Sequence, residues 1–227
     1  AAVIAETDAL ASFGRELAGV AEPIVRLAID AVTPLEPVLA VLRRAQARHP
    51  SVRIELRTER LAGVADALAE ERADLGIGTS LGLEQARLES APYTKVRVIP
   101  AARADHPLAT AGRPIPPALL RAHPQIVLRD SALADDAPSL NVLAGGVRWS
   151  VTDVGSKRDL IAAGMGWGGL PAHVVAGELA RGELVPLAVP EFEVDEMELF
   201  VLRRRGGTRG PVARSLWRAL RAPTASS

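Results

Sequence analysis

The side chains best suited to contact a ligand are small hydroxyls that follow short apolar runs. Thr33 comes after Val25–Ile29, and Thr58 and Thr79 follow the next two apolar runs of the chain. Arg60 stands near the second of them, where a guanidinium can bind a carboxylate through two hydrogen bonds. If these runs are parallel strands, the turns that follow lie on one sheet edge beside helix N-termini, which attract anions. Each residue is open to two interpretations, an anion-binding role or ordinary cap, turn and surface chemistry.

The residues that enzymes and metal sites use form no recognisable pattern in this chain. Its four histidines, at positions 49, 106, 123 and 173, are scattered, and none has a serine or glutamate partner at the spacing of a nucleophile or zinc motif. The sequence has no cysteine, which excludes thiol chemistry and disulfides. The Asp135-Asp136 pair is typical of a solvated loop. We therefore predict no catalytic residue, no metal site and no cofactor.

A glycine-rich segment satisfies the pattern G-x-G-x-x-G through Gly164, Gly166 and Gly169. In a dinucleotide-binding fingerprint this motif follows a strand and opens a helix. Here a predicted helix precedes the glycines and a predicted strand follows them. The glycines therefore indicate a helix stop and close backbone packing rather than a nucleotide site.

The segment from Val25 to Gly78 predicts a strand, helix, strand, helix and strand in that order. This order requires a parallel sheet with right-handed crossovers. The first helix is predicted to open with a capping box between Thr33 and Glu36, with Pro34 at its first position, and to close at His49-Pro50. Four apolar residues recur at helical spacing and are expected to face the core: Leu35, Val38, Leu39 and Leu42.

The segment from Val147 to Leu187 repeats this order of elements. Its first helix is expected to be capped by Ser156 with Asp159 and to stop at Gly164, and Pro171 is expected to open a second helix. The repetition predicts two small α/β lobes rather than one large sheet. A protein of this kind commonly holds a ligand between its lobes, at the carboxyl ends of the strands.

Charge and hydropathy limit the partners. Lys plus Arg equals Asp plus Glu, at 27 each, so the chain is not expected to hold a nucleic-acid backbone by itself.

Val3, Leu10 and Leu17 fall seven apart, which predicts a heptad-bearing helix that ends before Pro23. This helix either packs on its own domain or is the end of a longer linker that pairs with a second subunit. Because position 1 is Ala rather than Met, the chain is expected to be part of a longer protein.

Together these residues resemble the effector-binding domain of LysR-type transcriptional regulators. The resemblance lies in the order and spacing of four blocks: Val25–Gly78, Asp105–Ala109, Leu160–Pro171 and Leu179–Leu187. It implies an α/β, two-lobed fold of the type II periplasmic-binding-protein kind, with two crossover strands and the end of a linker helix in front. We therefore expect the linker helix at 1–22, lobe I at 23–98 plus 195–227, and lobe II at 99–194.

The resemblance also implies a function and a set of partners. A small inducer, often one that bears a carboxylate, binds between the lobes and changes how dimers and tetramers bend DNA. The implied partners are this small-molecule inducer and further copies of the chain, as a homodimer and, in the full-length protein, a tetramer. DNA is contacted only through a winged helix-turn-helix upstream of this sequence, and the protein is expected to be cytoplasmic, with no membrane partner.

By the family's pattern, the inducer would meet residues in several turns: Ala31, Val32, Thr33, Thr58, Arg60, Thr79, Ser131, Asp153, Val154, Gly166 and Trp167. Leu61 departs from that pattern, in which a small polar residue is common, so Thr58 or Arg60 is expected to take over its contact. Trp167 is either one wall of the site or a core residue.

Two rival functions remain: an enzyme, and a solute-binding protein of a transporter, which shares the fold but would carry an export signal upstream.

Overall fold

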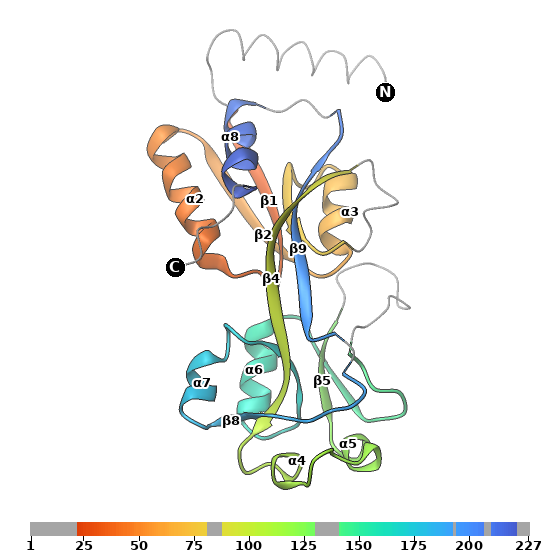
Figure 1. Ribbon diagram of the computed structural model, residues 1–227. Coiled ribbons are helices and arrows are strands. Elements are labelled where there is room, and N and C mark those ends of the chain that lie inside the picture. The colour runs from red at the N-terminus through yellow and green to blue at the C-terminus, as the bar shows by residue number, and fades with distance from the viewer. Residues whose placement is uncertain (1–21, 81–87, 130–140, 193, 207–209, 222–227) are drawn as a thin grey trace. The chain divides into compact units, whose positions relative to one another are not determined.

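The structure is a computed structural model that describes residues 22–80, 88–129, 141–192, 194–206 and 210–221 (Figure 1). Residues 1–21 of the predicted linker helix and Ser131 lie outside this range. The chain divides into two compact units: unit 1 runs to Thr94 and resumes at Glu198, and unit 2 is Lys95–Met197. The chain passes from one unit to the other in two strands, β4 (Leu88–Arg103) and β9 (Glu196–Arg204). These are the two crossover strands that the sequence predicts.

Unit 1 is built on a sheet with a parallel centre. Its other elements are β1 (Ile24–Asp30), α2 (Leu35–Arg48), β2 (Arg53–Glu59), α3 (Gly63–Ala69), β3 (Leu75–Gly78) and α8 (Pro211–Leu220). β1 pairs in parallel with β2 on one side and β3 on the other, and β9 joins β3 in antiparallel. Helices α2 and α8 contact each other on one face, and α3 covers the other (Figure 1), as right-handed crossovers require. The predicted order and parallel pairing are confirmed.

Helix α2 buries a different stripe from the one that its leucines predict. The buried residues are Val38, Val41 and Ala45, whereas Leu35 and Leu39 are 41% and 43% exposed. Residues three and four apart share one helix face, and the narrow side chains of this face let the helix lie close to its neighbours. The expectation that both leucines face the core is therefore wrong, and an apolar stripe of α2 remains exposed.

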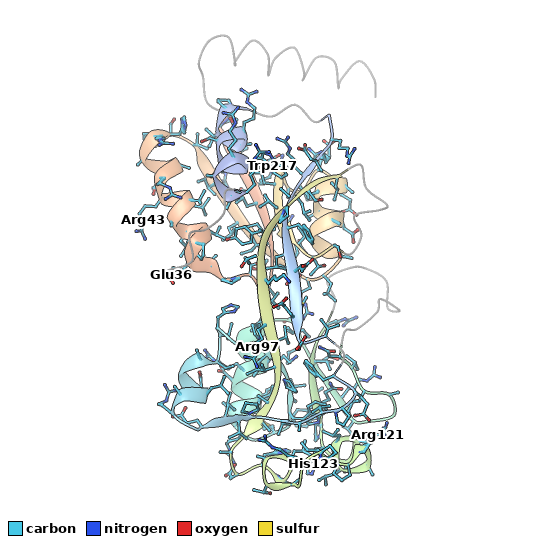
Figure 2. The ribbon with its side chains drawn as sticks, viewed as in Figure 1. Glu36, Arg43, Arg97, Arg121, His123 and Trp217 are labelled. Carbon is cyan, nitrogen blue, oxygen red and sulfur yellow. The ribbon has the colours of Figure 1, made fainter. Side chains whose placement is uncertain are left out.

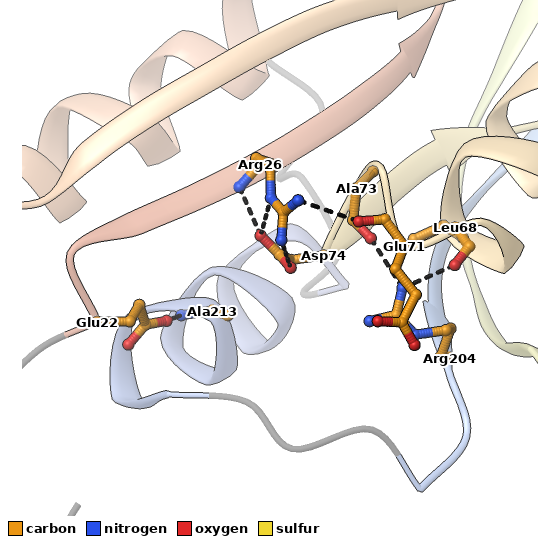
Figure 3. Close-up of polar contacts among 8 residues, drawn as sticks. All are labelled: Glu22, Arg26, Leu68, Glu71, Ala73, Asp74, Arg204 and Ala213. Carbon is orange, nitrogen blue, oxygen red and sulfur yellow. Dashed lines mark hydrogen bonds and ion pairs between the residues drawn. The ribbon is translucent and has the colours of Figure 1, made fainter. Parts of the chain in front are cut away.

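Polar contacts hold unit 1 together at the edge where β1 begins (Figure 3). The Arg26 guanidinium donates to Asp74 Oδ1 at 3.3 Å and to the carbonyl oxygen of Glu71 at 3.0 Å. The Arg204 guanidinium on β9 donates to the carbonyl oxygen of Leu68 at 2.7 Å, at the end of α3. Both arginines thus fix the turn between α3 and β3, and the charged groups of this edge serve the fold.

A carboxylate near the start of unit 1 caps its last helix. Glu22 Oε1 accepts from the backbone N–H of Ala213 at 2.6 Å (Figure 3). Its Oε2 accepts from the backbone N–H of Val212 at 3.1 Å. These N–H groups belong to the first turn of α8, where a negative charge is favourable. The last residue of the predicted linker is therefore tied to the C-terminal helix.

Unit 2 contains two shorter sets of strands. Its elements besides the crossovers are α4 (Pro107–Thr110), α5 (Pro117–Ala122), β5 (Gln125–Leu128), β6 (Arg148–Val151), α6 (Val154–Ala162), β7 (Gly168–Pro171), α7 (Ala176–Ala180) and β8 (Leu184–Pro186). β5 and β6 are parallel, and β4 pairs in antiparallel with β7 and β8. The predicted order of elements is confirmed, as is the stop after α6 at Gly164, whose φ is 79°. Pro171 ends β7 and opens no helix, so that expectation is wrong.

A histidine pair, in which His106 is buried and His123 is half-buried, lies where α4 begins and α5 ends. The Nδ1 of His106 accepts from the backbone N–H of Leu108 at 3.1 Å and caps α4. His123, at the end of α5 (Figure 2), lies edge-on to it with ring centroids 4.8 Å apart. The pKa of His106 is lowered, chiefly by burial and next by the charge of His123. The charge of Asp105 raises this pKa, and that of Arg103 lowers it. The cap needs the neutral ring, because a protonated Nδ1 cannot accept.

This geometry predicts a stability that falls with acid. A histidine whose folded pKa is lowered stabilises the fold fully above its unfolded pKa of about 6.5, and this contribution is lost as the pH falls toward the folded value. The His106→Asn variant keeps a cap acceptor without the titration. Urea unfolding of both proteins from about pH 7.5 to about pH 5 should show the steeper decline in the wild type. Parallel pH profiles would remove His106 as the titrating group.

Candidate functional site

The predicted turns of unit 1 meet at the carboxyl edge of its sheet. The parallel register pairs Asp30 with Glu59 and Ile29 with Ile77, so the turns after β1, β2 and β3 start side by side. The N–H of Ala31 donates to the carbonyl oxygen of Glu59 at 2.9 Å, which joins the first two turns directly. The predicted convergence of these turns is confirmed.

Asp30 organises this edge, although the sequence argument did not select it. Its side chain is buried, at 2% exposure, at the last position of β1. Oδ1 accepts from the N–H of Val32 at 3.0 Å, and Oδ2 accepts from the N–H of Leu61 at 2.7 Å. One carboxylate thus holds the turn that contains Thr33 against the turn that contains Arg60. Hydrogen bonds to an ionised acceptor are about twice as strong as neutral ones, so the two turns are held rigidly.

Thr33 presents a buried hydroxyl at this edge. Its backbone N–H donates to the carbonyl oxygen of Asp30 at 2.9 Å, and the residue is 7% exposed. Pro34 is the N-cap of α2, and no side chain caps the helix, so the predicted box between Thr33 and Glu36 is wrong. The turn bonded to Asp30 keeps Thr33 outside the helix. Within the described part of the chain, Thr33 Oγ1 is buried and has no hydrogen-bond partner.

The other predicted residues of unit 1 differ in exposure. Thr79 is buried, Arg60 is half-buried and Thr58 is exposed near the end of β2. Leu61 is 5% exposed, so its side chain packs in the core. Its φ is 46°, and its N–H donates to Asp30 Oδ2. The structure therefore places Thr33, Thr79 and Arg60 at one sheet edge and gives Leu61 a structural role.

In unit 2, Asp153 is the N-cap of α6. Its Oδ1 accepts from the backbone N–H of Ser156 at 2.7 Å, and its Oδ2 accepts from the Ser156 hydroxyl at 2.7 Å. These bonds lower the pKa of the Asp153 carboxyl. The predicted cap by Ser156 with Asp159 is thus wrong, since the helix begins at Val154, next to Asp153.

Gly166 and Trp167 lie away from that cap. Trp167 bridges to Gln125 at the start of β5, whereas Asp153 follows Val151, which pairs with Leu128 at its end. Gln125 and Leu128 are three residues apart, which is about 10 Å along a strand, so the structure does not bring these predicted residues to one end of β5. The Trp167 indole is fully buried in the core of unit 2, where its Nε1 donates to the carbonyl oxygen of Leu120 at 3.4 Å.

The described residues offer neither a metal site nor a membrane-spanning helix. They contain no group of three or more His, Asp or Glu side chains arranged to hold a metal ion. Their helices include none long and apolar enough to cross a membrane.

Comparison with known proteins identifies one family. The family model described as the LysR substrate binding domain matches residues 18–224. Among solved structures, the regulatory domain of CcmR from Synechocystis PCC6803 in complex with 2-PG is 22% identical, over 87% of this chain and 95% of that chain, with a TM-score of 0.67.

Two further regulatory domains share the fold. That of NMB2055 (MetR), a LysR family regulator from N. meningitidis, is 18% identical over 87% of this chain and 92% of its own, with a TM-score of 0.65. The effector binding domain of QuiR in complex with shikimate is 16% identical over 87% of this chain and 95% of its own, with a TM-score of 0.64. The predicted fold, of the type II periplasmic-binding-protein kind, is confirmed.

Proposed function

The chain belongs to the LysR substrate binding domain family and is a ligand-sensing regulatory domain of that kind, and from this premise we propose that it binds a small carboxylate at the carboxyl edge of the unit 1 sheet. One observation carries the proposal. Thr33 Oγ1 is buried at this edge without a hydrogen-bond partner in the described part of the chain. A buried hydroxyl is costly to leave unsatisfied, so a ligand oxygen is the partner that accounts for it.

The start of α2 supplies matching donors next to this hydroxyl. Prolines occupy the N-cap, Pro34, and the third helical position, Pro37, and have no N–H. Of the first three helical positions, Leu35 and Glu36 therefore carry N–H groups, which no carbonyl within the helix can use. Two N–H groups and one hydroxyl suit the two oxygens of a carboxylate, and the helix N-terminus favours its negative charge. Asp30 keeps these donors in place by fixing the turn.

The remaining predicted residues of unit 1 complete the proposed site. Arg60 is the cation of this edge and would bind a second acidic or hydroxyl group of the ligand. Thr79 and the backbone of Ala31 and Val32 form its floor, and Thr58 lies at its rim. The similar domain of QuiR is bound to shikimate, which carries a carboxylate, and this supports the ligand class proposed here.

We also propose the assembly that this family membership suggests. The linker at 1–22 would pair two copies into a homodimer, and the full-length protein would form a tetramer in the cytoplasm. DNA would be contacted only through a domain upstream of this sequence. The bound carboxylate would regulate the protein by shifting the equilibrium between conformations of this regulatory domain.

Thermal unfolding against matched acids and amides tests the proposed ligand class. Benzoate, succinate and shikimate would be compared with benzamide, succinamide and the amide of shikimate, which lack the negative charge. A ligand at one hundred times its Kd adds about 2.7 kcal/mol to the free energy of unfolding, which raises the Tm by about 5–10 °C for a chain of this size. We expect such a rise with at least one acid and none with its amide. Equal shifts with acid and amide, or no shift at all, would contradict a carboxylate site.

A further inference from the structure

We propose that Glu22 transmits movements of the unit 1 helices to the linker, through the contact between its carboxylate and the first turn of α8. We call this the linker contact. Glu22 is not one of the heptad residues Val3, Leu10 and Leu17, so the contact is compatible with a linker that pairs two copies. The linker contact is present without ligand, and its role in regulation rests on the proposed ligand site.

Helix α8 has no cap of its own. Its N-cap residue, Gly210, has no side chain, and Pro211 at the first helical position has no N–H. The N–H of Ala213 donates to Glu22 Oε1 at 2.6 Å (Figure 3). The N–H of Val212 donates to Glu22 Oε2 at 3.1 Å, across 190 positions of the chain. One carboxylate near the start of the chain thus supplies the whole cap of the last helix.

Gly210 provides the space for this carboxylate. A methyl group at position 210 would overlap the Glu22 carboxylate. The φ of Gly210 is −71°, which any residue adopts, so the backbone does not require glycine here. Serine, aspartate and asparagine are preferred at an N-cap, but their side chains would displace Glu22. The glycine is therefore explained by a cap that comes from Glu22.

Glu22 is the position at which the linker meets unit 1. The next residue, Pro23, is already held by the sheet, because its carbonyl oxygen accepts from the N–H of Arg53 at 2.9 Å. Proline also restricts φ to about −65°. Since the chain is fixed from Pro23 onward, the linker contact sets the direction in which the linker leaves unit 1.

Helix α8 joins the linker contact to the helix that starts at the ligand edge. α8 and α2 contact each other (Figure 1), and both are anchored by buried residues, among them Val38 of α2 and Leu216 of α8. Close-packed helices do not move independently, so a shift of one displaces the other. A carboxylate bound at the N-terminus of α2 would therefore change the position of α8, and Glu22 would pass this change to the linker.

One pair of variants separates the cap from the linker contact. Glu22→Ala leaves two N–H groups of α8 without their acceptor and should lower the Tm by about 2–6 °C. Adding Gly210→Ser to this variant supplies a hydroxyl at the N-cap and should bring the Tm back to within about 2 °C of the wild type. In the double variant α8 is capped, but the linker is no longer tied to it.

Spin labels then report the direction of the linker. The chain has no cysteine, so Ala18→Cys and Arg218→Cys place one label on the linker and one on the exposed side of α8. Electron–electron resonance in an excess of unlabelled chain reads distances within one copy. We expect a narrow distance distribution in the otherwise unchanged chain, and a shift when the acid with the largest thermal effect is added. The double variant should give a broader distribution that the acid does not shift.

Three results overturn the proposal. The first is a Tm of Glu22→Ala equal to that of the wild type, and the second is a labelled double variant that matches the otherwise unchanged chain with and without acid. The third is a label distance that stays constant although the acid raises the Tm. If no acid raises the Tm, the ligand site is contradicted instead. The variant Tm values and the widths of the distributions then still decide whether the linker contact exists.

Discussion

Replacing Asp30 by asparagine is expected to lower the free energy of unfolding by about 3 kcal/mol. The Asp30 carboxylate accepts from two backbone N–H groups, those of Val32 and Leu61, in a buried position. An asparagine side chain has one acceptor oxygen, so its NH₂ group must face one of these donors, and a buried N–H is left unsatisfied. The Tm of a chain of this size should fall by about 6–12 °C, as measured by circular dichroism.

Glu70→Gln is the control for Asp30→Asn. Glu70 also belongs to unit 1, and its exposed carboxylate pairs with Arg72 at 2.6 Å. Exposed pairs contribute about 0–1 kcal/mol, so this variant should unfold within a few degrees of the wild type. If Asp30→Asn were as stable as Glu70→Gln, the two turns of the sheet edge would be held by other groups.

Replacing Gly166 by alanine is expected to cost about 3 kcal/mol in unit 2. A methyl group at this position would overlap the carbonyl oxygen of Pro124 and lie 3.1 Å from Ile126 Cδ1. The same carbonyl accepts from the N–H of Trp167 at 3.1 Å, so the two segments cannot separate without losing a buried hydrogen bond. Urea unfolding followed by tryptophan fluorescence should show a lower midpoint with a similar slope.

Gly112→Ala is the matched control in the same unit. A methyl group at Gly112 would meet no described atom within 4 Å, and its φ lies outside the left-handed region. Alanine there should be neutral or should stabilise the chain by about 0.4–1 kcal/mol, because it restricts the unfolded state. Equal midpoints for the two variants would contradict the close backbone approach at Gly166.

The order of elements was predictable because it depends on local patterns. Alternating apolar runs, prolines and glycines indicated the strands and helices of residues 25–78 and 147–187, and the alternation of strand and helix required parallel pairing. The helix caps were not predictable in the same way. The sequence offers Thr33 and Ser156 as caps, but Pro34 and Asp153 take these positions. At α2 no side chain caps the helix, because the turn bonded to Asp30 holds Thr33 outside it, and at α6 Asp153 caps in place of the nearby Ser156.

The candidate site was predictable in part for a similar reason. An aspartate that ends a strand often bonds the N–H two residues on, and this local signal at Asp30 and Val32 was available in the sequence. Its second bond, to Leu61, joins residues 31 positions apart and had no local signal. The positions of Gly166 and Trp167 relative to Asp153 depend on which strand lies beside β5. Strand neighbours in unit 2 follow from packing and not from the order of elements.

Isothermal titration of three proteins tests most directly whether the Thr33 hydroxyl binds the carboxylate. The acid that gives the largest thermal shift would be titrated into the wild type, Thr33→Ser and Thr33→Val. The serine variant keeps the hydroxyl and should bind within a few-fold of the wild type. The valine variant should bind at least about tenfold more weakly, because one hydrogen bond to a charged group contributes about 1.5–3 kcal/mol. Without ligand, Thr33→Val should have the same free energy of unfolding as the wild type, because the Thr33 hydroxyl caps no helix. Equal affinities for the valine variant and the wild type would remove Thr33 from the site and contradict the proposed function.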